Sequence, residues 1–157
     1  MAVFKAAQAL DMAMKIEENG EAFYEAAADK SDDTEVAALF RDLAARERAH
    51  YEVFERMAQG VEPAPKPTRE GEIGDFVSFV EAALDRAVFA GPDKALRLAE
   101  QAADRDTALR AAMGLEKDTL LFYYDLREMV SDADRDAISD IIGEEKQHLR
   151  RLANLVQ

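Results

Sequence analysis

The chain has 157 residues, of which 48% are hydrophobic and 34% are charged, and its formal net charge is −13. This length suits one domain with a sizeable core, and no apolar run is long enough to cross a bilayer. The acidic surplus argues against nucleic acid as a partner, because phosphate backbones are bound by clustered Lys and Arg. Cysteine is absent, which excludes disulfides, thiol nucleophiles and thiolate metal sites, so any metal must bind to oxygen and nitrogen atoms. No cleavable signal is recognisable at the N-terminus, and we expect a cytoplasmic protein without membrane partners.

Apolar residues recur at spacings of three and four along most of the chain, which is typical of amphipathic helices. The first long helix is expected over about residues 3–30. The second is expected over about residues 34–59, after an N-cap at Asp32 or Asp33. Gly60 is the predicted stop of this second helix.

The connection that follows has a different composition. The stretch GVEPAPKPTREGEIG at 60–74 is rich in Pro and Gly, which predicts a surface linker. Two shorter helices are expected after it, in DFVSFVEAALDRAVFAG at 75–91 and in DKALRLAEQAA at 93–103. These residues would carry the chain from the second long helix to the third.

A third long helix is expected over about residues 106–131, with Asp104 or Asp106 as its N-cap. The sequence SDADRD predicts the next turn, and a fourth helix is expected over about 134–155. The chain is therefore predicted to be one all-α domain, 1–157, with these parts: hairpin one 3–59, linker and short helices 60–105, hairpin two 106–155.

The two hairpins repeat a pattern of acidic, aromatic and histidine residues. The first helix contains AMKIEENGEAFYEAA and the third contains AMGLEKDTLLFYYDL, which align without gaps. On the second helix of each hairpin, one of the only two histidines lies three residues after a glutamate. The matched pairs are Glu17 and Glu116, Tyr24 and Tyr123, Glu47 and Glu145, and His50 and His148. Two such hairpins predict a four-helix bundle with a pseudo-two-fold axis.

The spacing favours a metal site inside this bundle. Residues three apart share one face of a helix, so each Glu-x-x-His pair can point inward. Four glutamates and two histidines would be too costly in a dry core without cations. Ferritin-like di-metal bundles use this pattern, with one Glu from each of two helices and Glu-x-x-His from each of the others. The repeat assigns Glu17 and His50 to one metal, Glu116 and His148 to the other, and Glu47 and Glu145 to both as bridges. The alternative is a duplication in which these residues are ordinary surface.

The repeated tyrosines have a possible role beside the metals. Tyr24 lies two helical turns, or about 10 Å, beyond Glu17 on the same face. Its hydroxyl could therefore donate a hydrogen bond to a ligand carboxylate on another helix, and Tyr123 could do the same from the other side. The alternative is that both are amphipathic core residues with the hydroxyl at the edge of the bundle.

Glu144, directly before the expected ligand Glu145, has two interpretations. It precedes His148 by four residues and could orient that ring, or it could lie on the surface. Arg46 occupies the equivalent place before His50, so the repeat gives the orienting role no counterpart.

The segments IEENGEAFYEAAA, ARERAHYEVF, GLEKDTLLFYYDL and IIGEEKQHLRRL together resemble the rubrerythrin branch of the ferritin-like superfamily. They cover the four long helices. The resemblance implies a ferritin-like four-helix bundle with a non-haem centre of two iron ions, although the ligand types also accept manganese or zinc. Members of this family reduce hydrogen peroxide, and relatives in the superfamily oxidise and store iron.

The chain departs from that family in two ways. Well-known rubrerythrins carry a rubredoxin domain with four cysteines, and this chain has none, so a separate protein would have to donate electrons. Those enzymes also have an extra glutamate three residues after the third-helix ligand. Thr119 stands there in this chain, and Gly20 occupies the equivalent place on the first helix.

Three functions remain open from the sequence, and with them the question of whether the chain is an enzyme. The leading interpretation is a di-iron oxidoreductase that acts on hydrogen peroxide or O2. The second is an iron-binding, ferroxidase or storage protein that takes up Fe(II) without peroxidase turnover. The third is a helical interaction module with a structural metal site. We expect a homodimer, because ferritin-like bundles often pair.

Overall fold

A computed structural model describes residues 2–61, 92–102 and 104–156. Within these ranges the chain is helical and contains no strand, as the sequence predicts. The helices are α1 (Ala2–Lys30), α2 (Thr34–Gln59), α4 (Pro92–Gln101), α5 (Arg105–Met129) and α6 (Asp132–Leu155). All but the first two residues of the linker predicted at 60–74, and the whole short helix predicted at 75–91, lie outside the described residues. None of the described helices has an apolar stretch long enough to cross a membrane.

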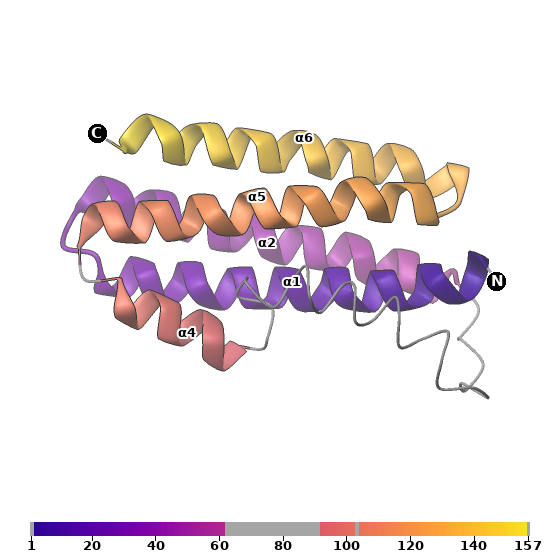
Figure 1. Cartoon of the computed structure of the whole chain (residues 1–157), viewed down its shortest axis with the longest axis horizontal. Coiled ribbons are helices and arrows are strands. Elements are labelled where there is room, and N and C mark those ends of the chain that lie inside the picture. The colour runs from indigo at the N-terminus through magenta and orange to yellow at the C-terminus, as the bar shows by residue number, and fades with distance from the viewer. Residues whose placement is uncertain (1, 62–91, 103, 157) are drawn as a thin grey trace.

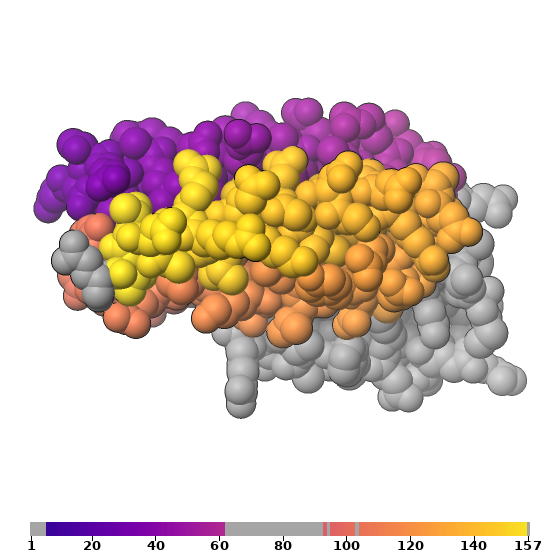
Figure 2. Space-filling model, turned by 90° about the horizontal axis from the view of Figure 1, so that it is seen from above, coloured from indigo at the N-terminus to yellow at the C-terminus, as the bar shows by residue number. Residues whose placement is uncertain are grey.

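The four long helices lie side by side along one axis (Figure 1). α1 and α2 form one antiparallel hairpin, and α5 and α6 form another. α2 and α5 run in the same direction, so the end of α2 and the start of α5 lie at opposite ends of the bundle. This up-down-down-up arrangement with one long crossover is that of ferritin-like bundles. α4 packs along α1, and α6 lies between α2 and α5 (Figure 2).

Aspartate side chains fix the starts of two helices. Asp33, rather than Asp32, is the N-cap of α2, where its carboxylate accepts hydrogen bonds from the backbone N–H groups of Glu35 and Val36. Asp104, rather than Asp106, caps α5 by accepting from the N–H of Thr107. These bonds satisfy N–H groups that have no partner inside the helix.

The turn between α5 and α6 lies two residues earlier than the sequence predicts. α5 ends at Met129 and α6 begins at Asp132, whereas the predicted helices end at about 131 and begin at about 134, so most of SDADRD is helical. Asp132 and Asp134 occupy the first turn of α6, where the positive end of the helix dipole favours negative charge. Ser131 precedes this turn in an extended conformation.

The buried apolar residues form two clusters at different levels of the bundle. The first contains Phe23, Tyr24, Phe40, Leu43, Leu109 and Leu152 with their neighbours. The second contains Leu10, Ile16, Phe54, Tyr123, Leu126 and Ile138 with theirs. On each long helix, the repeated glutamates and histidines fall between the residues of the two clusters. The polar centre is therefore enclosed by apolar side chains along the bundle axis.

Candidate metal centre

The six residues that the repeat singles out meet in the middle of the bundle. They are Glu17 on α1, Glu47 and His50 on α2, Glu116 on α5, and Glu145 and His148 on α6, and all of them are buried. They form two overlapping groups, in each of which one possible ligand atom per residue lies within 4.8 Å of the others. One group contains Glu17, Glu47, His50 and Glu145; the other contains Glu47, Glu116, Glu145 and His148. Glu47 and Glu145 belong to both groups.

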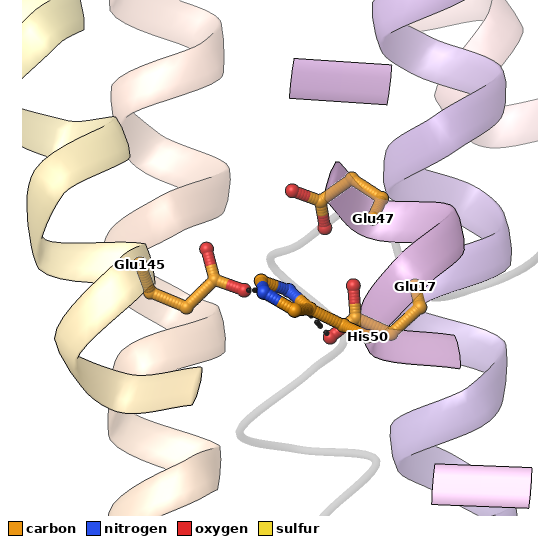
Figure 3. Close-up of side chains that lie close together, drawn as sticks. All are labelled: Glu17, Glu47, His50 and Glu145. Atoms are coloured by element: carbon orange, nitrogen blue, oxygen red, sulfur yellow. Dashed lines mark ion pairs between the residues drawn. The ribbon is translucent and has the colours of Figure 1, made fainter. Parts of the chain in front are cut away.

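The helices explain why these side chains converge. Glu47 and His50 are three residues apart on α2 and therefore point the same way, as do Glu145 and His148 on α6. Figure 3 shows Glu145 reaching from α6 towards His50, Glu47 and Glu17, which come from α2 and α1 on the opposite side.

Glu145 lies between the two histidines. Its Oε1 is 2.9 Å from Nδ1 of His50, and its Oε2 is 2.9 Å from Nδ1 of His148. The two imidazole rings are stacked, with centroids 5.7 Å apart. Nδ1 of His50 is also 3.7 Å from Glu17, and Nδ1 of His148 is 3.7 Å from Glu116. Each histidine therefore presents Nδ1 to the carboxylates.

Several buried polar atoms of these residues have no hydrogen-bond partner among the described residues. They are Oε2 of Glu17, Oε1 of Glu47, Nδ1 of His50 and Oε1 of Glu145. Although the last two lie 2.9 Å apart, they are not aligned for a hydrogen bond. A buried polar atom without a partner is destabilising, and a bound cation would satisfy these acceptors together. The orphaned atoms and the oxygen and nitrogen ligands fit a pair of divalent ions.

Burial dominates the acidity of the carboxyl groups when no metal is bound. Desolvation and the neighbouring carboxylates raise the pKa of Glu17 and Glu47 well above the ordinary value, and they raise the pKa of Glu116 to about 8. Burial would raise the pKa of Glu145 as well, but the hydrogen bond with His148 and the charge of the adjacent His50 outweigh it and hold the pKa of Glu145 below the ordinary value. Glu145 is thus the carboxylate that remains negative between the two rings.

The histidines shift in the opposite sense to most buried histidines. Burial lowers the pKa of each ring, but the adjacent carboxylates more than compensate. The pKa is raised to about 9 for His50 and to about 10 for His148. Without metal, therefore, protons occupy the positions at which cations would bind.

The two tyrosines contact carboxylates of the opposite hairpin. The hydroxyl of Tyr24 on α1 donates a hydrogen bond to Oε1 of Glu116 on α5. The hydroxyl of Tyr123 on α5 donates one to Oε1 of Glu17 on α1. Both tyrosines are almost completely buried, so their hydroxyls lie inside the bundle and not at its edge.

Glu144 contacts a different histidine from the one suggested by the sequence. Its Oε2 is 3.2 Å from Nε2 of His50, 94 residues away, whereas the local spacing pointed to His148. The spacing of four residues along α6 could not reveal this contact, because it depends on how α6 packs against α2.

Gly20 is a further residue of the site that sequence reasoning did not identify as such. A Cβ atom added to it would lie 3.0 Å from Oε2 of Glu47 and 3.3 Å from its Cγ. The missing side chain therefore makes room for Glu47. Thr119, the matching residue on α5, is buried and carries no carboxylate. In the sequence, this close approach to Glu47 was indicated only by the glycine at position 20, where the repeat has Thr119.

Comparisons with known proteins agree with this architecture. A crystal structure of a Thermotoga maritima protein, provisionally described as a ferritin-like diiron-carboxylate protein, superposes with a TM-score of 0.66. The two are 23% identical, and the match covers 96% of this chain and 93% of that one, which shows a shared fold. A search of curated proteins found no significant match. The sequence matches the rubrerythrin family over residues 8–156. The chain therefore belongs to the rubrerythrin family.

Proposed function

We propose that this chain is a di-iron carboxylate oxidoreductase that acts on hydrogen peroxide or O2 with electrons from an external donor. The observation that carries the proposal is the pair of overlapping ligand groups, each with three carboxylates and one histidine. Glu47 and Glu145 would bridge the ions, with Glu17 and His50 completing one position and Glu116 and His148 the other. Four carboxylates would balance the charge of two divalent ions, and bound Fe(II) would supply two electrons to the oxidant.

The surrounding residues would keep this chemistry in place. Tyr24 and Tyr123 each donate a hydrogen bond to one oxygen of Glu116 and Glu17, and the second oxygen of each carboxylate would bind the metal. Their own pKa values are raised well above the ordinary value, chiefly by burial, so both hydroxyls keep their protons. The apolar clusters on both sides limit the access of water along the bundle axis.

The partners of this reaction are part of the proposal. Fe(II) would load the site, and hydrogen peroxide or O2 would oxidise it. Because these 157 residues contain no cysteine, they hold no rubredoxin-type iron site, and electrons would come from a separate donor protein. We further propose that the chain works as a homodimer in the cytoplasm.

Stopped-flow mixing of the Fe(II)-loaded protein with hydrogen peroxide tests the proposal. We expect rapid oxidation at two iron ions per chain, and continued consumption of peroxide when a reductant is supplied. A Glu47→Ala, His148→Ala double variant provides the control with a disabled site. Failure of the wild type to bind iron, or slow oxidation equal to that of the control, would exclude a di-iron oxidoreductase. Wild-type metal content in the double variant would instead favour an interaction module whose metal lies elsewhere.

A ferroxidase without peroxidase turnover is the second candidate, and Thr119 favours it. This buried residue stands where well-known rubrerythrins have an extra glutamate, so that ligand is not available. Comparing oxidation by O2 and by peroxide on the same loaded protein separates the two functions. Fast oxidation with a single turnover, even when reductant is present, would support the ferroxidase. Size-exclusion chromatography adds a test of storage, since a discrete dimer lacks the closed shell that storage requires.

A further inference from the structure

The two halves of the centre differ at the outer side of the histidine rings. Nε2 of His50 is 3.2 Å from Oε2 of Glu144. Nε2 of His148 has no side-chain hydrogen bond or ion pair within residues 2–61, 92–102 and 104–156, because the contacts of this ring are made by Nδ1. Both rings face the carboxylates with Nδ1, so Nε2 is in each case the nitrogen left for a supporting contact.

The cause of this difference lies in one pair of matched positions. Arg46 precedes His50 by four residues, as Glu144 precedes His148, and the repeat therefore relates Arg46 to Glu144. A guanidinium has only donors and cannot accept a hydrogen bond from an imidazole N–H. NH1 of Arg46 lies instead 3.9 Å from Oε2 of Glu144, so both residues of the pair serve the His50 side.

We propose that Glu144 is a positioning residue for His50 and makes the two metal positions unequal, with the tighter one at His50. A carboxylate that accepts from the outer N–H of a metal-bound imidazole fixes its tautomer and orientation and makes the inner nitrogen a stronger donor. His148 has no such partner among the described residues, so its position binds the weaker ion. The inference rests on the proposed function in one respect, that the six residues bind two ions.

Titration of the metal-free protein with Co(II), followed by visible absorption and calorimetry, tests the inequality. We expect two binding steps in the wild type. Loss of such a supporting contact costs about 10–100-fold in metal affinity. Because the Glu144 side chain is 45% exposed, we expect Glu144→Ala to weaken Co(II) affinity in the first step by about tenfold, the lower end of this range. Glu144→Gln keeps an acceptor and should fall in between. Asp140→Ala, one turn earlier on α6 and exposed, removes the same charge and should leave both steps unchanged.

A double-mutant cycle separates positioning from a general structural effect. Glu144→Ala should still weaken binding when His148 is replaced by alanine, because the His50 position remains. It should have no effect when His50 is replaced by alanine, because its partner is gone. Arg46→Glu should place a carboxylate beside His148 and so reduce the difference in Co(II) affinity between the two binding steps. Arg46→Gln should leave this difference unchanged.

The outcomes distinguish this inference from the proposed function. Two equal steps in the wild type, or an equal loss in both steps of Glu144→Ala, would overturn the inequality and leave the di-metal centre intact. An effect of Glu144→Ala that persists without His50 would also overturn it. No uptake of Co(II) or Fe(II) by the wild type would overturn the di-metal centre, and the inference with it.

Discussion

The hydroxyl of Tyr24 donates a hydrogen bond to Oε1 of Glu116, although the two residues are 92 positions apart and belong to different hairpins. Tyr123 and Glu17 repeat this relationship in the opposite direction. Each hairpin therefore supplies the tyrosine that orients a carboxylate of the other hairpin, and that carboxylate belongs to only one of the two ligand groups. Loss of either hydroxyl should affect the metal position on the opposite side of the pseudo-two-fold axis.

Replacement of Tyr24 by phenylalanine tests this relationship. The ring should remain packed against Phe23, at a centroid distance of 5.4 Å, so that only the donor to Glu116 is lost. We expect about a tenfold loss of affinity for one of the two ions, measured by Co(II) titration. Tyr123→Phe should affect the other ion through Glu17. Tyr124→Phe is the matched control because its side chain is 37% exposed, and unchanged affinity in both buried variants would contradict the role.

The overlap of the two groups predicts how metal content responds to single substitutions. Glu145→Gln removes a charged ligand from both groups, so we expect the loss of both ions. Glu17→Gln or Glu116→Gln changes one group only, and one ion per chain should remain. Mass spectrometry of the intact protein under native conditions measures the count. Retention of two ions by Glu145→Gln would show that this glutamate is not a shared ligand.

The metal-free protein should lose stability as the pH rises. Burial raises the pKa of Glu116 to about 8, and the carboxylates raise the pKa of His50 to about 9 and of His148 to about 10. The folded state therefore binds more protons than the unfolded state from about pH 5 upward, and the stability from these groups is lost as the pH passes each folded value. Each extra proton that the folded state binds lowers the free energy of unfolding by about 1.4 kcal/mol per pH unit as the pH rises. The lowered pKa of Glu145 acts in the opposite direction, but only in acid.

Thermal unfolding of the chelated protein between pH 5 and pH 9 measures this effect. We expect the melting temperature to fall across this range and to recover when metal is added. Glu17→Gln imitates the protonated carboxyl and should flatten the dependence, whereas Glu18→Gln on the exposed neighbour should not. A melting temperature independent of pH in the chelated wild type would contradict the raised pKa values of these buried groups.

Gly20 provides a test of the space that Glu47 needs for metal binding. Alanine in a helix interior is favoured over glycine by about 1 kcal/mol. The new Cβ, however, would lie 3.0 Å from Oε2 of Glu47, so that this carboxylate must move. We expect Gly20→Ala to weaken metal binding without unfolding the bundle. Gly114→Ala adds the same methyl group where nothing lies within 4 Å, and it should raise the melting temperature and leave metal affinity unchanged.

Much of the architecture was predictable because the repeat carries long-range information. The alignment of Glu17 with Glu116 placed matching residues at one level of two helices before any contact was known. The rise of a helix then placed Tyr24 out of reach of Glu17 and within reach of another helix. The sequence could not choose Asp33 over Asp32 as a cap, because both offer the same carboxylate and only the backbone conformation differs.

The contacts that the sequence could not provide are those that break the repeat. Glu144 reaches His50 because of how α6 packs against α2, and spacing along one helix suggested His148. The closeness of Gly20 to Glu47 likewise depends on the separation of α1 and α2, which no residue pattern encodes. Local spacing identifies the six candidate ligands, but the contacts that support them follow from the packing of one helix against another.

The sharing of Glu47 and Glu145 also orders the assembly of the chain. Each ligand group takes three of its four residues from one hairpin and the fourth from the other. Neither hairpin can complete a group alone, so a nascent chain with only its first half outside the ribosome lacks at least one residue of each group. An ion bound after synthesis would link the two hairpins, and separating them would require its bonds to one hairpin to break.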